Sequence, residues 1–474
     1  MMLRFVKLVT CLLIVSSSFA QDKWDLRRSV EYALQNNISV KQADLQIRFA
    51  QLDLKQAKLS QYPNANYSAN VGYGSGRNQD PTNFSLITTG YLFSNHSLQT
   101  GVDVFNWFSK RSTIQARALD AASAKAGFEK AQNDVALNVA VAYLQALLAN
   151  EQIRVAGVQV EQTKSQLEST RKQVEAGNLP EINAAQLEAQ LAADSATLIT
   201  AETSARQSAL QLKALMNLDA ALPFVIDTPP VELIPVESIA DLQPETVYGL
   251  ATVNMPQQKV DLLNIHSAQK YVQAARAAMY PTFSLFGSLG SSYNNKSQQL
   301  LSVSAVSLPV GKVTVGSTTY DVFASQPRYN YGDFPYFDQL NQNFRQSVGL
   351  SLSVPIFNGG NLRSAWQRSK LNLQQAELNK EQNSQTLKQD IYTAYNDATA
   401  ALQKFNANKK AVETAQKTYD FATKRFEVGL LSTYDLITSQ NNLTRAKYDM
   451  LSSQYDYVFK IKLLEFYKGQ GLKL

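Results

Sequence analysis

The sequence predicts a mainly helical fold with membrane β-structure. Its unit is two strands followed by a long helical hairpin, present twice, and three chains would build a twelve-stranded β-barrel continued by an α-helical coiled-coil tunnel. Three observations predict this class: a seven-residue apolar repeat too long for a compact domain, strands with period-two alternation ahead of it, and a second copy of both in the C-terminal half.

The stretch from Ser109 to Met216 is predicted to form a long helix, a break at 175–180 and a second helix that runs back. A sustained seven-residue repeat on two adjacent rows is a coiled-coil seam with a left-handed supercoil. At about 1.5 Å per residue, the outgoing helix would be roughly 95 Å long. The two rows are Val139, Ala146, Ile153, Val160, Leu167 and Val174, and Val135, Ala142, Ala149, Ala156 and Thr163.

The C-terminal half repeats this pattern at an offset of 252 residues, the separation of Val139 and Ile391. The break at 427–429 matches the break at 175–177, so two hairpins of equal arm length are expected. This agreement indicates a structural duplication rather than two unrelated coiled coils. The second pair of rows is Ile391, Ala398, Phe405, Val412, Tyr419 and Phe426, and the small residues Ala394, Ala401, Ala415 and Ala422.

Alternating segments precede each hairpin. Residues 64–74 place Ala, Tyr and Val on one side and Asn, Ser and Gly on the other, which is typical of a strand with one apolar and one polar face. Residues 98–104, 283–289 and 350–354 repeat the alternation, whereas 75–95 is rich in turn formers and is expected to be a loop. Four strands cannot close a barrel, but three copies would supply twelve.

The N-terminus indicates an exported protein. Residues 1–20 combine a short basic region, an apolar core and small residues at the end, which is typical of a signal peptide. The single cysteine, Cys11, lies in this leader, so the mature chain is expected to form no disulfide. The remainder is predicted to comprise a first repeat, 21–245, ending in a Pro-rich linker, and a second, 246–474, with an extracellular insertion at about 294–343.

Composition and motifs exclude several functions. The 45 basic and 39 acidic residues are dispersed along the predicted helices, and no basic stripe is interleaved with aromatics, so nucleic acid is a poor candidate partner. His96 and His266 have no Cys, Asp or Glu companion at ligand spacing, so no metal site is predicted. Phosphate loops and nucleophile elbows are missing too, so the sequence predicts no enzyme, no catalytic residue and no cofactor.

Short motifs accompany the duplication. Tyr62-Pro63 and Tyr280-Pro281 precede the first strand of each half, residues 354–360 read Val-Pro-Ile-Phe-Asn-Gly-Gly, and residues 426–436 read Phe-Glu-Val-Gly-Leu-Leu-Ser-Thr-Tyr-Asp-Leu. With these motifs in this order, essentially the whole mature chain resembles the TolC family of outer-membrane efflux and secretion channels. The resemblance implies a homotrimer surrounded by lipid in the outer membrane of a Gram-negative bacterium, with a periplasmic helical tunnel closed at its far end.

The resemblance further implies docking to a periplasmic adaptor protein and, through it, to an inner-membrane transporter. The leading hypothesis is therefore the exit duct of a tripartite efflux pump, which conducts small toxic compounds passively. A close alternative is the duct of type I protein secretion, since the inner-membrane partner decides between the two. The alternative from a different class is a structural coiled-coil protein of the periplasm that conducts nothing.

Function is expected to concentrate at the two hairpin tips. In the resembling family an acid near the second tip lines the constricted entrance, and Asp435 stands there; three copies would form a carboxylate ring that favours cations. The alternative is that Asp435 only caps its helix, together with Ser432. The best-known family member latches its gate with an ion pair, for which this sequence has Asn183 and Leu431. That pair cannot form, so the gate is predicted either to be held by other contacts, namely Tyr434, Phe426 and Asn183, or to be less tightly latched.

The residues at the two breaks are predicted to be exposed and to meet the adaptor, because exposed leucines invite a partner. The alternative is that neighbouring tips pack against each other inside the trimer. These residues are Gly177, Leu179, Gly429, Leu430 and Leu431.

Overall fold

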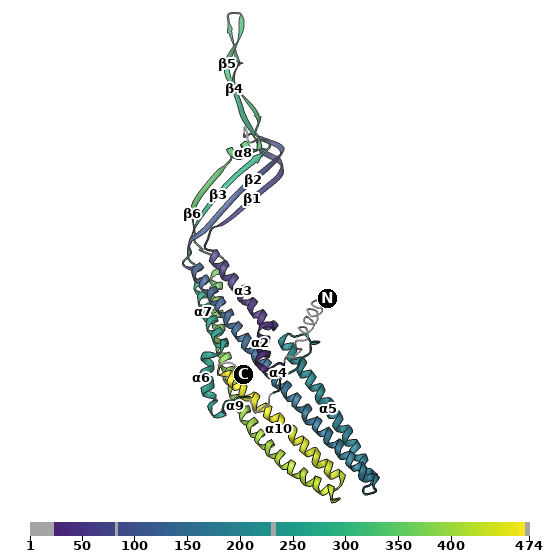
Figure 1. The fold of residues 1–474 in the computed structure, drawn as a ribbon. Helices are drawn as coiled ribbons and strands as arrows, with labels where there is room; N and C mark the ends of the chain where they lie inside the picture. The colour runs from purple at the N-terminus through teal and green to yellow at the C-terminus, as the bar shows by residue number, and fades with distance from the viewer. Residues whose placement is uncertain (1–22, 81–83, 229–233, 470–474) are drawn as a thin grey trace, which may run out of the picture. The chain divides into compact units, whose positions relative to one another are not determined.

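The structure, a computed structural model, describes residues 23–80, 84–228 and 234–469 (Figure 1). The predicted signal peptide, 1–20, lies outside the described residues. The chain forms two compact units, which are treated separately below. The strand unit consists of Leu54–Ala116 and Gln269–Lys370, and the helical unit of Met1–Asp53, Arg117–Ala268 and Leu371–Leu474.

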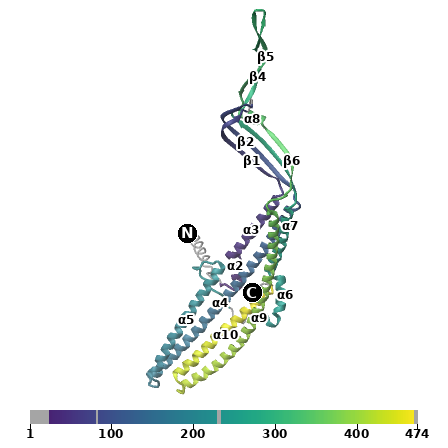
Figure 2. The ribbon, with the colours of Figure 1, turned by 180° about the vertical axis from the view of Figure 1, so that it is seen from behind.

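A four-stranded antiparallel sheet forms the centre of the strand unit, in the order β1–β2–β3–β6 (Figure 2). The four predicted alternating segments all lie in this sheet. Strands β1 and β6 are its edges, and neither pairs with a further strand in the described part of the chain. The strands are β1 (Asn64–Gln79), β2 (Leu86–Phe105), β3 (Thr282–Asn294) and β6 (Arg345–Ser353).

The expected loop over 75–95 is wrong for most of its length. Strands β1 and β2 stay paired from Asn64 opposite Gly101 to Gln79 opposite Leu86. Within this segment Gly90 is covered by the aromatic ring of Tyr73 on the facing strand. A β carbon at Gly90 would lie 2.6 Å from Cζ of Tyr73, so the ring takes the place of the missing side chain and the strand continues.

The sheet has one apolar and one polar face, as the period-two alternation predicts. On the polar face, hydroxyl pairs join neighbouring strands: Ser68 Oγ lies 2.7 Å from Ser97 Oγ, and Ser288 Oγ lies 2.8 Å from Ser347 Oγ. The large side chains on the other face are exposed within one chain, so the described residues leave that face uncovered along most of the sheet. They are Tyr67, Val71, Leu98, Leu285, Leu289, Val348, Leu350 and Leu352.

The insertion between β3 and β6 contains regular structure that the sequence analysis did not predict. Strands β4 (Gln298–Val315) and β5 (Thr318–Asp333) form a separate two-stranded hairpin, closed at a turn where Gly316 has a φ of 68°. A short helix, α8 (Tyr336–Gln342), follows the hairpin and leads into β6.

The two predicted helical hairpins are confirmed. Helices α4 (Ser109–Glu175) and α9 (Asn361–Glu427) each have 67 residues and begin 252 residues apart. The returning helices are α5 (Glu181–Met216) and α10 (Thr433–Tyr467). Every residue of the predicted seam rows is buried or half-buried. The seven-residue repeat therefore identified the packed face of each long helix.

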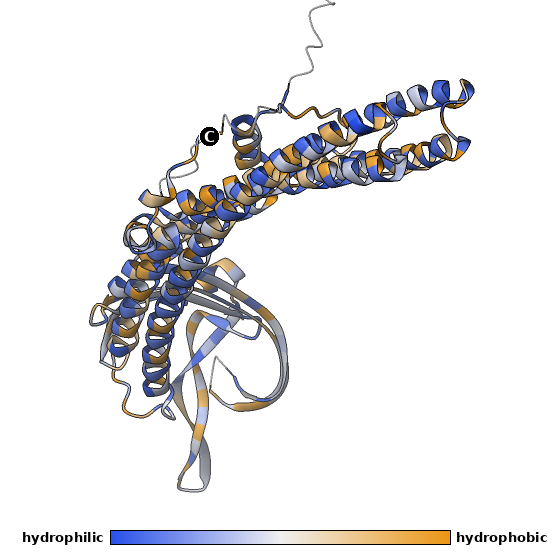
Figure 3. Cartoon of the chain, turned by 90° about the horizontal axis from the view of Figure 1, so that it is seen from below, coloured by the Kyte–Doolittle hydropathy of each residue, from blue (hydrophilic) through white to orange (hydrophobic). Residues whose placement is uncertain are grey.

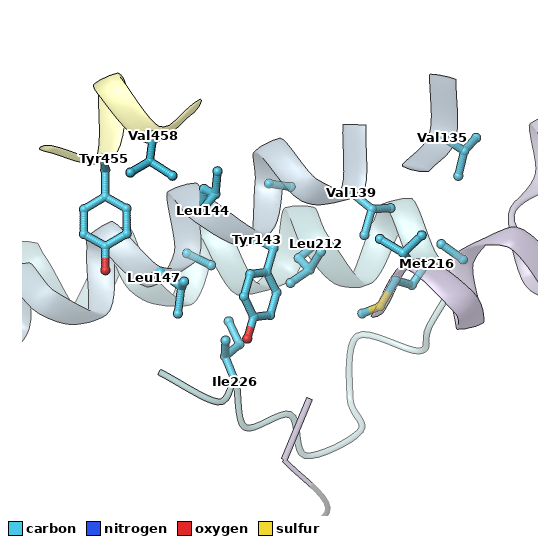
Figure 4. Packing of buried hydrophobic residues seen from close by; sticks show 14 of the residues in the cluster. Val135, Val139, Tyr143, Leu144, Leu147, Leu212, Met216, Ile226, Tyr455 and Val458 are labelled. Carbon is cyan, nitrogen blue, oxygen red and sulfur yellow. The ribbon is translucent and has the colours of Figure 1, made fainter. Parts of the chain in front are cut away.

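The largest apolar cluster lies in the helical unit, where Val135 and Val139 of α4 pack with Leu212 and Met216 of α5 (Figure 4). Tyr143 is buried among them, and its hydroxyl donates to the backbone oxygen of Asp227 at 2.7 Å. Burial raises the pKa of this hydroxyl, so it remains a proton donor. Tyr143 thereby ties the segment after α5 to the first hairpin.

Shorter helices complete the chain. They are α2 (Leu26–Asn36) and α3 (Ile38–Leu59) before the sheet, and η2 (Ile239–Asp241), α6 (Pro244–Asn254) and α7 (Pro256–Ala277) in the second half. The predicted Pro-rich linker, 222–245, contains the short helix η2 and is otherwise largely irregular where described, and it ends as α6 begins with Pro244 at its first turn. Hydrophilic and apolar residues alternate along the long helices (Figure 3), and none of the described helices is long and apolar enough to cross a membrane.

Candidate functional site

The two hairpin tips are built on the same backbone turn. Gly177 and Gly429 follow the ends of α4 and α9 in the left-handed conformation, with φ of 75° and 72°. In each tip two backbone hydrogen bonds close a Schellman motif, in which a residue with a β carbon would be strained. The bonds run from Gly177 N to Val174 O (2.9 Å), Asn178 N to Gln173 O (2.8 Å), Gly429 N to Phe426 O (3.0 Å) and Leu430 N to Arg425 O (2.8 Å).

An apolar cluster lies behind the second tip and corrects part of the predicted exposed surface. Phe426 is buried with Leu436, and Leu179 and Leu431 are half-buried against them. Leu179 and Leu431 are therefore less exposed than the sequence predicted, because both pack into this cluster, Leu179 from the first tip and Leu431 from the second. Leu430 is 68% exposed, and Gly177 and Gly429 are exposed too.

The three predicted gate residues differ in how far their side chains are buried. Phe426 packs inside the cluster, which indicates a role in holding one chain together. Asn183 is half-buried in the first turn of α5, where its backbone N–H donates to Pro180 O at 3.1 Å. Tyr434 is 69% exposed in the first turn of α10. Asn183 and Tyr434 thus retain side-chain surface for contacts beyond the chain.

Asp435 takes part in the cap of α10. Ser432 Oγ accepts from Asp435 N at 3.1 Å and donates to Asp435 Oδ2 at 2.7 Å. The carboxylate itself is exposed. This geometry leaves Asp435 free to act both as a capping residue and as a charged group at the tip.

A buried polar layer joins the two hairpins above the tips and was not found by sequence reasoning. We define it as the buried Gln159, Thr163, Asp194 and Gln440 and the half-buried Thr444, which come from α4, α5 and α10. Its hydrogen bonds run from Thr163 Oγ1 to Asp194 Oδ2 (2.6 Å), Gln440 Nε2 to Thr163 Oγ1 (2.9 Å) and Thr444 Oγ1 to Gln159 Oε1 (2.6 Å).

One sequence signal pointed to the polar layer. Thr163 is the only polar residue in the two seam rows of α4, and a polar residue at a seam position needs a buried partner. The sequence does not identify that partner, since Asp194 and Gln440 lie on other helices and no common sequence repeat relates them to Thr163.

A groove of about 430 Å³ opens beside the polar layer, between α5 and α10. Its lining includes Gln190, Asn441, Arg445 and Tyr448. Gln190 Nε2 donates to Asp194 Oδ1 at 2.8 Å and to Asn441 Oδ1 at 3.0 Å, so the groove floor continues the polar layer. Burial, and then the charge of Asp194, raise the pKa of Tyr448, whose hydroxyl therefore stays protonated.

Comparison with known proteins places the chain among outer membrane transport proteins. The family model described as "Outer membrane efflux protein" matches residues 30–218 and 247–460. The outer membrane protein TolC of Escherichia coli is 26% identical over 151 residues, which are 32% of this chain and 30% of TolC. The pyoverdine export protein OpmQ and the alkaline protease secretion protein AprF, both of Pseudomonas aeruginosa, are 23% and 22% identical over 74% and 72% of this chain. The matches span 64% of OpmQ and 63% of AprF, so the chain matches less than two thirds of each of these relatives.

Solved structures share the fold at low sequence identity. The outer membrane channel CmeC of Campylobacter jejuni has a TM-score of 0.74 at 18% identity, with 94% of this chain and 86% of CmeC covered. The outer membrane protein VceC of Vibrio cholerae has a TM-score of 0.70 at 16% identity, with 94% of this chain and 96% of VceC covered. These matches confirm the predicted fold at the level of a mostly helical chain with a sheet.

Proposed function

The chain belongs to the outer membrane efflux protein family, and from this premise we propose that it is the exit duct of a tripartite efflux pump. In this role it conducts small molecules, drugs and other toxic compounds among them, from the periplasm to the exterior. Conduction is passive, and the energy comes from an inner-membrane transporter coupled through a periplasmic adaptor.

The observation that carries the proposal is the four-stranded sheet with two unpaired edges and one exposed apolar face. A sheet in a bilayer must close, because lipid offers no partner for the backbone groups of an edge strand. Pairing β1 of one copy with β6 of the next, around a three-fold axis, gives a closed homotrimeric barrel of twelve strands. Its apolar face then contacts lipid and its polar face lines water.

The helical hairpins are proposed to continue the barrel as a periplasmic tunnel. The small residues of the second seam row, such as Ala142 and Ala394, are buried and allow close helix packing. In this arrangement the tips form the far end, where the duct opens and closes. The docking surface for the adaptor is proposed to be centred on Leu430, with Gly177 and Gly429 beside it and Leu179 and Leu431 supporting it from the apolar cluster.

Two measurements test this proposal. Purified protein in detergent is expected to migrate on a gel as a compact trimer until it is boiled, and as a monomer afterwards. The trimer in a planar bilayer is expected to give discrete conductance steps. A detergent-independent monomer that conducts nothing would instead favour a structural coiled-coil protein.

Type I protein secretion is the second candidate, and the similarity to AprF, named for secretion of alkaline protease, favours it. The two functions share the duct and differ in the inner-membrane transporter. Mild crosslinking of membranes followed by identification of the captured transporter separates them, since a protein-secretion transporter on the duct would replace efflux as the proposed role.

The proposed entrance charge gives a direct prediction. Asp435→Asn is expected to lower the preference of the channel for cations over anions by at least about fivefold, because a unit charge at 4 Å in water changes the free energy of a cation by about 1 kcal/mol and that of an anion by the opposite amount. The asparagine amide oxygen still accepts from Ser432, so the helix cap is retained. Reversal potentials in a salt gradient give the preference. Glu202→Gln, which removes an exposed charge from the middle of α5, is the control, and equal behaviour of both variants would refute the carboxylate ring.

A further inference from the structure

Helix α8 lies on the apolar face of the sheet, over its two central strands. Tyr336 Oη is 2.8 Å from His96 Nε2 of β2, and the Tyr336 ring packs on Tyr293 of β3 at 4.8 Å between centroids. Ser291 Oγ donates to the backbone oxygen of Leu340 at 2.6 Å. His96 is paired with Ser291 in the register, so these contacts lie on the face that carries Leu98 and Leu289.

The position of α8 is fixed by a buried amide. Gln339 is buried, and its side chain accepts from Asn294 N at 3.0 Å while it donates to Asn294 O and to Phe334 O at 3.1 and 2.7 Å. Asn343 Nδ2 donates to Ser292 O at 2.7 Å just after the helix. The helix is thus fastened to the end of β3 and is not simply a continuation of the β4–β5 hairpin.

The exposed side of α8 carries one large aromatic ring among polar residues. Phe337 is 80% exposed beside the exposed Asp338, Asn341 and Gln342, and Phe344, which follows the helix, is also exposed. Under the helix, β2 and β3 carry polar residues on this face: Ser94, His96 and Ser291 follow the pair Leu98 and Leu289, while β1 stays apolar at Val71 and Tyr73. Helix α8 therefore covers a polar stretch of β2 and β3 near the end of the apolar face.

The opposite end of the apolar face also carries aromatic residues. Trp107 stacks on Tyr280 at 5.1 Å, and its Nε1 donates to Pro281 O at 2.7 Å. On β3 the interval from Phe283 to Tyr293 is ten residues, which is about 34 Å along a strand. At a strand tilt of about 45° this corresponds to a height of roughly 24 Å, close to the apolar band of about 25 Å in outer-membrane barrels.

We infer that α8 is a membrane contact that lies at the boundary between lipid headgroups and acyl chains in the outer leaflet, with Phe337 inserted into lipid. The inference rests on the proposed function, since it requires the apolar face of the sheet to meet the bilayer. Aromatic side chains favour this boundary, and an amphipathic helix there buries its apolar side in lipid. The β4–β5 hairpin then lies wholly outside the membrane.

A second copy of the chain is a poorer occupant for this surface. Helix α8 sits over β2 and β3, whereas the copies of the proposed trimer meet at β1 and β6.

Spin labels on single cysteines test the depth of α8. The chain has one cysteine, Cys11, in the predicted leader, so each variant carries a single label site in the mature protein. The variants are Phe337→Cys, Val348→Cys on the apolar face of β6 opposite Gly287, and Tyr320→Cys near the hairpin turn. Each is reconstituted in vesicles of phosphatidylcholine and phosphatidylglycerol, and its collision rates with oxygen and with a water-soluble nickel complex are measured.

The label at 348 is expected to be accessible to oxygen and protected from nickel, and the label at 320 to show the reverse. The label at 337 is expected to give an intermediate ratio, at a depth of about 5–10 Å. The inference is overturned if the accessibility of the label at 337 equals that of either reference label, or if neither reagent reaches it. The proposed function still stands in that case, provided that the label at 348 is accessible to oxygen and protected from nickel. A nickel-accessible label at 348 instead counts against the proposed barrel itself.

Discussion

Val348→Arg is expected to abolish the heat-resistant trimer and to deplete the protein from the outer membrane. Val348 lies on the apolar face of β6 and is 79% exposed within one chain, so the substitution removes little packing inside that chain. In the proposed barrel its side chain lies near the middle of the bilayer. An arginine there costs about 2–4 kcal/mol in each copy, or about 6–12 kcal/mol in a trimer.

The neighbouring residue gives a matched control. Ser347→Arg places the same side chain on the polar face, where it would extend into the water-filled lumen, and loses only the hydroxyl pair with Ser288. Trimer yield is read from unboiled and boiled samples of the outer-membrane fraction. If the two variants assemble equally well, the apolar face does not contact lipid.

Asp194→Ala is expected to weaken the polar layer by about 2–6 kcal/mol. Asp194 of α5 is 7% exposed and accepts from Thr163 of α4 and from Gln190, so alanine removes an acceptor from two buried or half-buried donors, and Thr163 in turn accepts from Gln440 of the second hairpin. Each such group costs about 1–3 kcal/mol. Because 1.4 kcal/mol is a factor of ten, amide hydrogen exchange around residues 159–163 and 440–444 is expected to accelerate by roughly 30- to 20,000-fold.

Two controls separate the polar layer from a general effect of charge removal. Asp194→Asn keeps an oxygen acceptor for Thr163 and is expected to accelerate exchange much less. Glu202→Ala removes an exposed acid from the same helix, whose ion pair with Arg206 is worth well under 1 kcal/mol. Slow exchange around 159–163 in the Asp194→Ala protein would show that the layer does not hold the hairpins together.

The expected location and family are supported at the level of sequence. The family match covers both repeats, 30–218 and 247–460, and confirms the predicted outer membrane location in a Gram-negative cell. The motifs that carried the resemblance, such as Tyr62-Pro63 and Tyr280-Pro281, precede β1 and β3.

The sequence also predicted the hairpin tips well and their surroundings poorly. Gly177 and Gly429 could be identified as helix ends because a left-handed residue after a helix is a local requirement. The burial of Phe426, Leu179 and Leu431 could not, since it depends on how the two hairpins pack on each other. The same is true of Asp194, whose partners come from α4 and, through Thr163, from α10.

The sequence by itself determined the long helices, their seam and their breaks, because a seven-residue repeat and a glycine turn act between neighbours along one chain. Only the tertiary structure decided that residues 75–79 and 86–95 are strand, since the two segments pair with each other and the Tyr73 ring covers Gly90. It likewise decided that α8 returns to the apolar face of the sheet through contacts with His96 and Ser291. Such contacts join residues up to 240 positions apart, and no local period encodes them.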